Sequence, residues 1–264
     1  MYKGAIFFDY DGTLTDENCH IYTPTEKTNI ALEKLRRSGY ATFLTTGRMK
    51  AMTTLVSGKF TGLITSNGAY TEVDGKCINN VFIPDEVIKH AVEYMNKENI
   101  YYALENQICG YSNGLKTENF LNMLDHFKLA RSLFKPHTCG MDIGGVNQLI
   151  VSYSSESVIE KMIEEFKNTL SIKKHRYFLS ADINDINTSK ADGVKAVLDY
   201  LNIPKENSYA FGDGDNDYSM LTAVGHPIAM GDHSKMLESV SEYITKTVKQ
   251  DGIFHALSEY YKII

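Results

Sequence analysis

The chain alternates strand-like and helix-like segments, and a long stretch of different character interrupts this alternation. In residues 1–82, apolar strand-like runs such as "GAIFF" alternate with helix-like segments. The same alternation resumes from about residue 187. Such alternation predicts a parallel sheet with right-handed crossover connections. Between residues 83 and 186, two apolar stripes with helical spacing accompany several strand candidates. We therefore expect an α/β fold in which an α+β unit is inserted into a parallel-sheet domain.

Local signals place individual elements within this plan. The segment "TPTEKTNIALEKLRRSG" predicts a helix with Thr23 as N-cap, Pro24 at the first helical position and Gly39 closing it in the left-handed conformation. Residues 49–58 predict a second helix, and residues 174–180 predict a strand of the inserted unit.

Composition limits the classes of function. The 264 residues are 43% hydrophobic and 23% charged, as in an ordinary globular protein with an ample core. The net charge is −6 and no basic run of five or more residues is present, so nucleic acid is a poor candidate partner. The N-terminal apolar run is too short for a signal peptide, and no long apolar segment follows. We expect no membrane partner, a cytoplasmic location, and a monomer or weak homo-oligomer.

Polar residues gather where predicted strands end or the following helices begin. In a parallel α/β sheet, ligands bind beyond the carboxyl ends of the strands. Groups far apart in the sequence are therefore expected to converge on one pocket. The four segments are "DYDGT" (residues 9–13), "TTGR" (residues 45–48), "SKADG" (residues 189–193) and "GDGDND" (residues 212–217).

The acidic residues of these segments predict a divalent cation. Two like charges 4 Å apart repel by about 4 kcal/mol at an effective dielectric near 20, so several carboxylates in one pocket need a counter-charge. A ligand set of oxygens without His or Cys favours Mg²⁺ over zinc. The residues concerned are Asp9, Asp11, Asp213 and Asp217.

The spacing of Asp9 and Asp11 indicates phosphoryl chemistry. Alternate residues at a strand end face the same side, so both carboxylates can address one substrate. One carboxylate can attack phosphorus, while the other exchanges protons with the leaving group and water. Lys190 opens a helix whose N-terminus favours anions, and it can contact both Asp9 and phosphoryl oxygens. Thr46 offers a hydroxyl, and Gly47 offers a backbone N–H with close approach.

The four segments resemble, in order, the signature motifs of the haloacid dehalogenase-like superfamily. "FFDYDGTL", "LTTGR", "SKADGV" and "FGDGDNDYSML" correspond to the first to fourth motifs. The position of the insert resembles the Cof-type phosphatase branch, which has a class IIB cap. The resemblance implies a Rossmann-like catalytic core in residues 1–82 and 187–264, and an α+β cap domain in residues 83–186.

The resemblance also implies roles for single residues. Asp9 corresponds to the nucleophile and Asp11 to the general acid/base. Mg²⁺ would be held by Asp9, the Asp11 backbone carbonyl and Asp213, with support from Asp217. Phosphate would be contacted by Thr46, Gly47, Lys190 and Asn216.

The sequence departs from the family pattern in two places, and a further segment is similar to it. Gly231, Asp232 and His233 stand where the family usually has Gly-Asn-Ala, and Ala191 stands where many relatives have Gly. Neither position carries a catalytic group. "SNGA" (residues 66–69) is similar to the segment that precedes the cap in the family.

These observations predict a Mg²⁺-dependent phosphatase of small phosphorylated metabolites, such as sugar phosphates, that works through an aspartyl-phosphate. Two alternatives stay open: a phosphomutase acting on a sugar phosphate, and a phosphate-binding or signalling protein without turnover. An EF-hand is excluded, because a loop starting at Asp9 has Leu14 where Gly is required and His20 where Glu is required. The sequence does not indicate which metabolite is the substrate.

Overall fold

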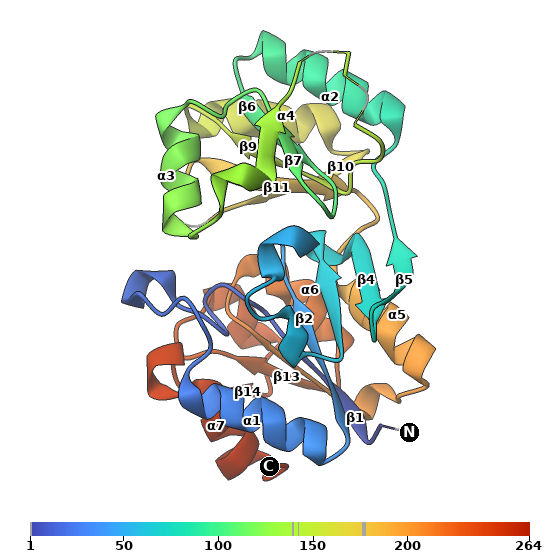
Figure 1. Ribbon diagram of the computed structural model, residues 1–264, viewed down its shortest axis with the longest axis vertical. Helices are drawn as coiled ribbons and strands as arrows, with labels where there is room; N and C mark the ends of the chain where they lie inside the picture. The colour runs from blue at the N-terminus through green and yellow to red at the C-terminus, as the bar shows by residue number, and fades with distance from the viewer. Residues whose placement is uncertain (1, 139, 142, 176–177) are drawn as a thin grey trace. The chain divides into compact units, whose positions relative to one another are not determined.

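The chain forms two compact units, which are described separately. The computed structural model describes residues 2–138, 140–141, 143–175 and 178–264. The core unit comprises the chain up to Thr46, together with Thr53–Asn79 and Ser189–Ile264. The cap unit comprises Gly47–Met52 and Asn80–Thr188 (Figure 1). The domain boundaries expected from the sequence, at residues 82/83 and 186/187, stay a prediction.

The core unit contains an eight-stranded sheet with the order β14-β13-β12-β1-β2-β3-β4-β5. From β14 to β3 every neighbouring pair is parallel, and β4 then pairs antiparallel with β3. The sheet is therefore mixed, while its central strands follow the predicted Rossmann-like arrangement. The strands are β1 (Gly4–Phe8), β2 (Tyr40–Thr45), β3 (Gly62–Thr65), β4 (Tyr70–Val73), β5 (Lys76–Asn80), β12 (Ser208–Gly212), β13 (His226–Ala229) and β14 (Tyr243–Ile244).

Helices cover both faces of this sheet, as expected for strands that are apolar on both sides. On one face, Leu35 and Leu257 pack in a cluster with Ile6 and Phe8 of β1. On the other face, Val194 packs in a cluster with Phe7. The first face carries α1 (Glu26–Arg37) and α7 (Gly252–His255), and the second carries α5 (Lys190–Leu201) and α6 (Tyr218–Ala223) (Figure 1).

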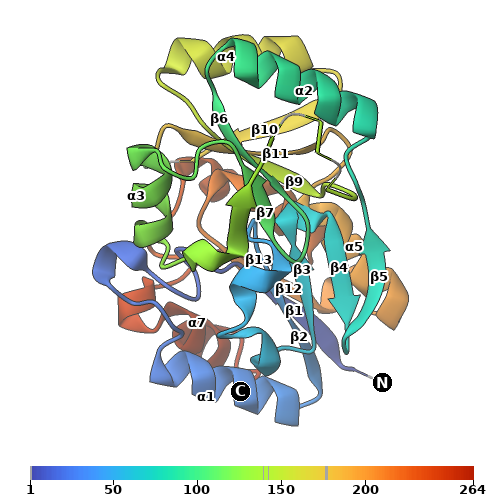
Figure 2. The ribbon, with the colours of Figure 1, turned by 45° about the horizontal axis from the view of Figure 1, so that its top comes forward.

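The cap unit is an α+β structure with a six-stranded sheet, in agreement with the fold class expected for the insert. The strand order is β10-β11-β9-β6-β7-β8, and every pair except β7–β8 is antiparallel. Helices α2 and α4 lie side by side on one face (Figure 2). The elements are β6 (Tyr101–Glu105), β7 (Gly110–Ser112), β8 (Phe134–Pro136), β9 (Gln148–Ser152), β10 (Leu170–Lys174), β11 (Ser180–Asp185), α2 (Asp85–Lys97), α3 (Glu118–His126) and α4 (Glu156–Phe166).

Two local predictions for the core unit differ from the structure. The N-cap of α1 is Thr25 rather than Thr23: its hydroxyl accepts a hydrogen bond from the Thr28 N–H. Gly39 does take the predicted left-handed conformation, with φ +84°. The helix predicted over residues 49–58 is replaced by two short 3-10 turns, Lys50–Thr53 and Ser57–Lys59.

The helix predicted at residues 49–58 fails because its first part belongs to the cap unit. The N–H groups of Lys50 and Ala51 donate to the side-chain and backbone oxygens of Gln107, at 3.0 and 3.1 Å. Met49 and Met52 are buried in an apolar cluster of that unit. Donors used in this way are not available for a regular helix.

The strand predicted at residues 174–180 also differs from the structure. Strand β10 ends at Lys174 and β11 begins at Ser180, while residues 176 and 177 lie outside the described residues. The hairpin therefore turns where the sequence pattern predicted a continuous strand.

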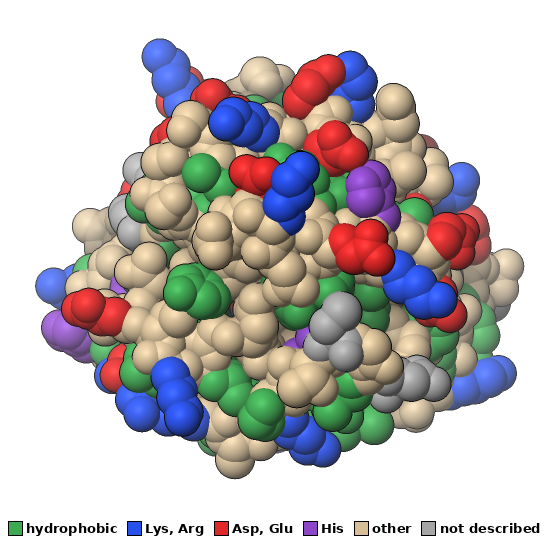
Figure 3. Space-filling model, turned by 90° about the horizontal axis from the view of Figure 1, so that it is seen from above, with side chains coloured by type: hydrophobic (Ala, Val, Ile, Leu, Met, Phe, Trp, Pro, Cys, Tyr) green, Lys and Arg blue, Asp and Glu red, His purple; other side chains and the backbone are tan. Residues whose placement is uncertain are grey.

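The described surface carries charges of both signs, as the composition predicts. In Figure 3, acidic side chains are interspersed with Lys and Arg side chains. The Lys and Arg side chains therefore form no basic patch on the face shown. Among the described residues, no helix combines the length and apolar character needed to cross a membrane. Cys19, Cys77 and Cys109 are unpaired, and Cys139 lies outside the described residues.

Candidate active site

The site begins at the carboxyl ends of adjacent parallel strands. Strand β1 lies between β12 and β2, with Phe8 in register with Phe211 on one side and Leu44 on the other. The Asp9 N–H continues this ladder by donating to the Phe211 carbonyl at 3.0 Å. The sheet thus places Asp9 centrally, with the segment before Asp213 on one side and the segment that ends at Thr46 on the other.

The turn after β1 brings the chain against Asp213. Gly12 has φ +89°, and a Cβ at this position would lie 2.2 Å from Asp213 Oδ2. Glycine is therefore required both by its backbone conformation and by this close approach. The buried Thr13 hydroxyl donates to Asp213 Oδ1 at 2.8 Å. Thr13 was not predicted as a site residue, and the only sequence signal for it is its place in the turn.

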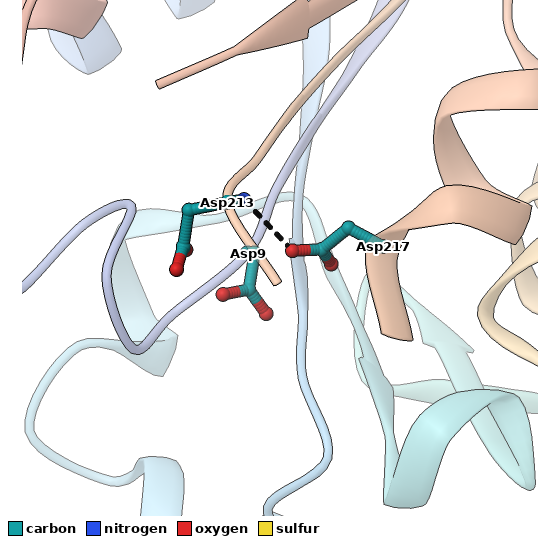
Figure 4. Close-up of side chains that lie close together, drawn as sticks. All are labelled: Asp9, Asp213 and Asp217. Carbon is teal, nitrogen blue, oxygen red and sulfur yellow. Dashed lines mark hydrogen bonds between the residues drawn. The ribbon is translucent and has the colours of Figure 1, made fainter. Parts of the chain in front are cut away.

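Three carboxylates and one ammonium group meet at this point. Oxygens of Asp9, Asp213 and Asp217 lie within 4.8 Å of one another, and Figure 4 shows the three side chains close together. Lys190 Nζ donates to Asp9 Oδ1 at 2.5 Å and to Asp217 Oδ1 at 2.6 Å. Lys190 is only 1% exposed, although an isolated lysine is almost never buried. The contacts with the carboxylates of Asp9 and Asp217 explain why Lys190 is buried.

The start of α5 positions Lys190. A capping box joins Ser189 and Asp192: the Ser189 N–H donates to Asp192 Oδ2 at 2.8 Å. Because the helix begins at Lys190 itself, its first turn fixes the backbone from which the ammonium group reaches Asp9.

Asp217 is oriented by its own loop. Its Oδ2 accepts a hydrogen bond from the Asp213 N–H at 2.9 Å (Figure 4). The same oxygen accepts a second one from the Gly214 N–H at 3.0 Å. Its Oδ1 accepts from Lys190. Since both oxygens already accept hydrogen bonds, Asp217 holds the loop and Lys190 in place.

The crowded negative charge shifts the protonation of the site. Burial, and then the charge of Asp217, raises the pKa of Asp9 to about 8. Burial, followed by the charges of Asp9 and Asp217, raises the pKa of Asp213 well above its usual value. Burial alone would lower the pKa of Lys190, but the charges of Asp217 and Asp9 raise it, so this group stays cationic. One ammonium group is too little positive charge for three carboxylates.

These residues therefore fit a divalent cation. Asp9 and Asp213 offer oxygen ligands, and no His or Cys belongs to the described cluster. Burial of excess negative charge is costly unless a cation compensates it. Hard divalent cations are bound by carboxylate oxygens, so the donor set suits Mg²⁺ or a similar ion.

The other predicted site residues have different surroundings. Asp11 is half-buried, and its charge contributes, after larger causes, to the raised pKa of Asp9. Thr46 is buried at the end of β2, and Asn216 lies in the 3-10 turn Asp215–Asp217. Gly47 belongs to the cap unit, where its carbonyl accepts a hydrogen bond from Gln148 Nε2 at 2.8 Å.

Comparison with known proteins gives a consistent set of similarities. The family model described as haloacid dehalogenase-like hydrolase matches residues 6–257. The putative phosphatase YkrA of Bacillus subtilis is 28% identical, over 98% of each chain.

Two solved structures are similar over nearly the whole chain. The first is the phosphatase BT1666 from Bacteroides thetaiotaomicron, with a TM-score of 0.84, 27% identity, and coverage of 99% of this chain and 96% of that one. The second is described as the HAD subclass IIB sugar phosphatase BT4131, with a TM-score of 0.82, 25% identity, and coverage of 99% and 100%.

Proposed function

The chain belongs to the haloacid dehalogenase-like hydrolases, and on that basis we propose that it is a Mg²⁺-dependent phosphatase of small phosphorylated metabolites. The observation that carries this proposal is the buried contact of Lys190 with Asp9 and Asp217, beside a third carboxylate, Asp213. Sugar phosphates are the first substrates to test, because BT4131 is described as a sugar phosphatase.

Asp9 is the proposed nucleophile. Its carboxylate forms a bond to the phosphorus of the ester while the bond from phosphorus to the ester oxygen breaks. Asp11 gives a proton to the departing alkoxide, so the first product leaves as an alcohol. Asp11 then takes a proton from water, whose oxygen attacks the phosphorus of the aspartyl-phosphate. Inorganic phosphate leaves, and the Asp9 carboxylate is restored.

Lys190, Thr46, Gly47 and Asn216 are proposed to hold the phosphoryl group. Lys190 already contacts Asp9, so its ammonium group is placed to offset charge on the phosphoryl oxygens. The hydroxyl of Thr46, the N–H of Gly47 and the amide of Asn216 supply neutral donors.

Asp9, the Asp11 carbonyl and Asp213 are the proposed metal ligands, with Asp217 in a supporting role. A bound Mg²⁺ would supply the positive charge that keeps Asp9 ionised and offsets the charge of the phosphoryl oxygens.

A substrate panel tests the proposal. Purified protein is expected to release inorganic phosphate from one or more phosphorylated sugars, cofactors or nucleotides, and from p-nitrophenyl phosphate, when Mg²⁺ is present. A chelator should abolish the release, and added Mg²⁺ should restore it. Absence of release across the panel with Mg²⁺, or release that a chelator leaves unchanged, would contradict the proposal.

The pH dependence of metal stabilisation gives a separate prediction. Between the ordinary pKa of 3.8 and the folded value of about 8, Asp9 keeps its proton in the folded protein and loses it in the unfolded chain. The unfolded state thus binds fewer protons, and this group lowers the stability of the metal-free protein as pH rises through that window. Mg²⁺ requires the ionised carboxylate. The metal should therefore stabilise the protein more at high pH than at low pH.

The measurement is the rise in melting temperature on adding Mg²⁺, followed from about pH 5 to about pH 8. At a Mg²⁺ concentration about 100 times Kd, the gain in unfolding free energy is about 2.7 kcal/mol. Asp9→Asn should reduce the pH dependence of this gain, while Asp213, whose pKa is also raised, still contributes to it. A gain of equal size at both ends of the window would contradict the prediction.

A further inference from the structure

The loop after β3 has an unusual backbone. Ser66, Asn67 and Gly68 follow one another with φ angles of +50°, +52° and +100°. All three residues are buried. A left-handed conformation costs a non-glycine residue about 1–2 kcal/mol, and asparagine tolerates it better than most. Such strain persists only where the surrounding structure fixes it, and it is common at functional sites.

This loop contacts three segments that carry proposed functional residues. The Asn67 N–H donates to the Thr46 carbonyl at 3.0 Å. Asn216 Nδ2 donates to Asn67 Oδ1 at 3.4 Å. At Gly68, a Cβ would lie only 2.0 Å from the Ser189 carbonyl oxygen, so the loop packs directly against the residue before Lys190. All of these residues belong to the core unit.

The left-handed conformation at Asn67 makes two of these contacts possible from one residue. Its backbone N–H points to the end of β2, while its side-chain oxygen points to the 3-10 turn that carries Asn216. Thr46 is also held from its other side, because its N–H donates to the Ile64 carbonyl at 2.8 Å. The contact with Asn67 Oδ1 likewise defines which edge of the Asn216 amide faces the loop.

We propose that Asn67 is a positioning residue of the phosphate site, which fixes the Thr46 backbone through its N–H and the Asn216 side chain through its oxygen. The proposal rests on the proposed function, because it takes Thr46 and Asn216 as phosphate-binding residues. Asn67 does not itself contact substrate in this scheme. It sets the distance between two donors that lie in the segments following two different strands, β2 and β12.

Asn67→Gly separates positioning from folding. Glycine adopts the left-handed conformation without steric strain and keeps the N–H bond to Thr46, while the side-chain oxygen that accepts from Asn216 is lost. A hydrogen bond contributes about 0.5–1.5 kcal/mol, which corresponds to a loss of about 2-fold to about 13-fold. We expect KM for the substrate and Ki for inorganic phosphate to rise by this factor, with a smaller change in kcat.

Asn202→Gly is the matched control. Asn202 is also left-handed, with φ +52°, and it ends α5 on the exposed surface of the same unit. Its variant makes the same chemical change at an exposed position and should leave KM and Ki unchanged. Asn67→Ala should lose more stability than Asn67→Gly, because alanine bears the left-handed strain.

A double-mutant cycle with Asn216→Ala supplies the decisive readout. If Asn67 acts through Asn216, the effect of Asn67→Gly on Ki should disappear when Asn216 is already alanine. Equal effects in both backgrounds, or wild-type KM and Ki in Asn67→Gly, would overturn the inference while leaving the phosphatase proposal intact. A wild-type protein that releases no phosphate, and whose melting temperature does not respond to inorganic phosphate with Mg²⁺, would overturn both.

Discussion

Asp9→Asn is expected to lower kcat by at least about 10⁴-fold, a loss typical of removing a catalytic nucleophile. The amide oxygen of asparagine is a poor nucleophile and cannot form the aspartyl-phosphate. The loss should be in kcat on every substrate that the wild type accepts, including p-nitrophenyl phosphate. Phosphate from a labelled substrate should be recovered on the wild-type chain after rapid denaturation, and not on the variant.

Stability measurements distinguish this loss from unfolding. Burial makes an ionised Asp9 costly in the metal-free protein, as its raised pKa shows. In a chelator near pH 8, Asp9→Asn should therefore melt no lower than the wild type. Asp199→Asn, on the exposed face of α5, is the matched control and should keep full activity. Turnover by Asp9→Asn within about tenfold of the wild type would refute the assignment of the nucleophile.

The arrangement of the strand ends was largely accessible from the sequence. The alternating pattern predicts parallel strands, and parallel strands bring their carboxyl ends to one edge. Asp9 and the residues near 213 were placed in one neighbourhood for this reason, and the structure brings Asp9, Asp213, Asp217 and Lys190 together. The sequence also predicted that Lys190 can contact Asp9, and its ammonium group does so.

The sequence failed where a distant residue decides the local structure. Thr23 was predicted as the N-cap of α1, whereas the N-cap is Thr25, whose hydroxyl also donates to Asp251 Oδ1 at 2.8 Å, a contact across 226 positions. Gln107 likewise binds the N–H groups of Lys50 and Ala51. A local window contains neither partner. Asn67 is a third case, because its left-handed conformation is explained by contacts with Thr46 and Asn216, which are distant in the sequence.

Lys190→Met is expected to reduce both stability and turnover. Methionine fills a similar volume but leaves Asp9, Asp213 and Asp217 without the ammonium group that contacts two of them. Breaking a buried ion pair in this way costs about 3–5 kcal/mol. We expect this loss in the free energy of unfolding at neutral pH in a chelator, measured by denaturant titration. Turnover with Mg²⁺ should fall by at least about 10²-fold, because the phosphoryl oxygens also lose a cation.

The charge explanation predicts how this defect changes with conditions. Lowering the pH protonates the carboxylates, so the stability difference between Lys190→Met and wild type should shrink as pH falls toward about 5. Replacing Asp9 by Asn in the Lys190→Met background should recover part of the lost stability, since one buried carboxylate is removed.

Lys195→Met, an exposed position of the same helix, is the control for Lys190→Met. It should change the free energy of unfolding by no more than about 0.5 kcal/mol. If Lys190→Met unfolds like this control at every pH, the ammonium group does not stabilise the carboxylates. The argument that the site requires a divalent cation would then lose its electrostatic basis.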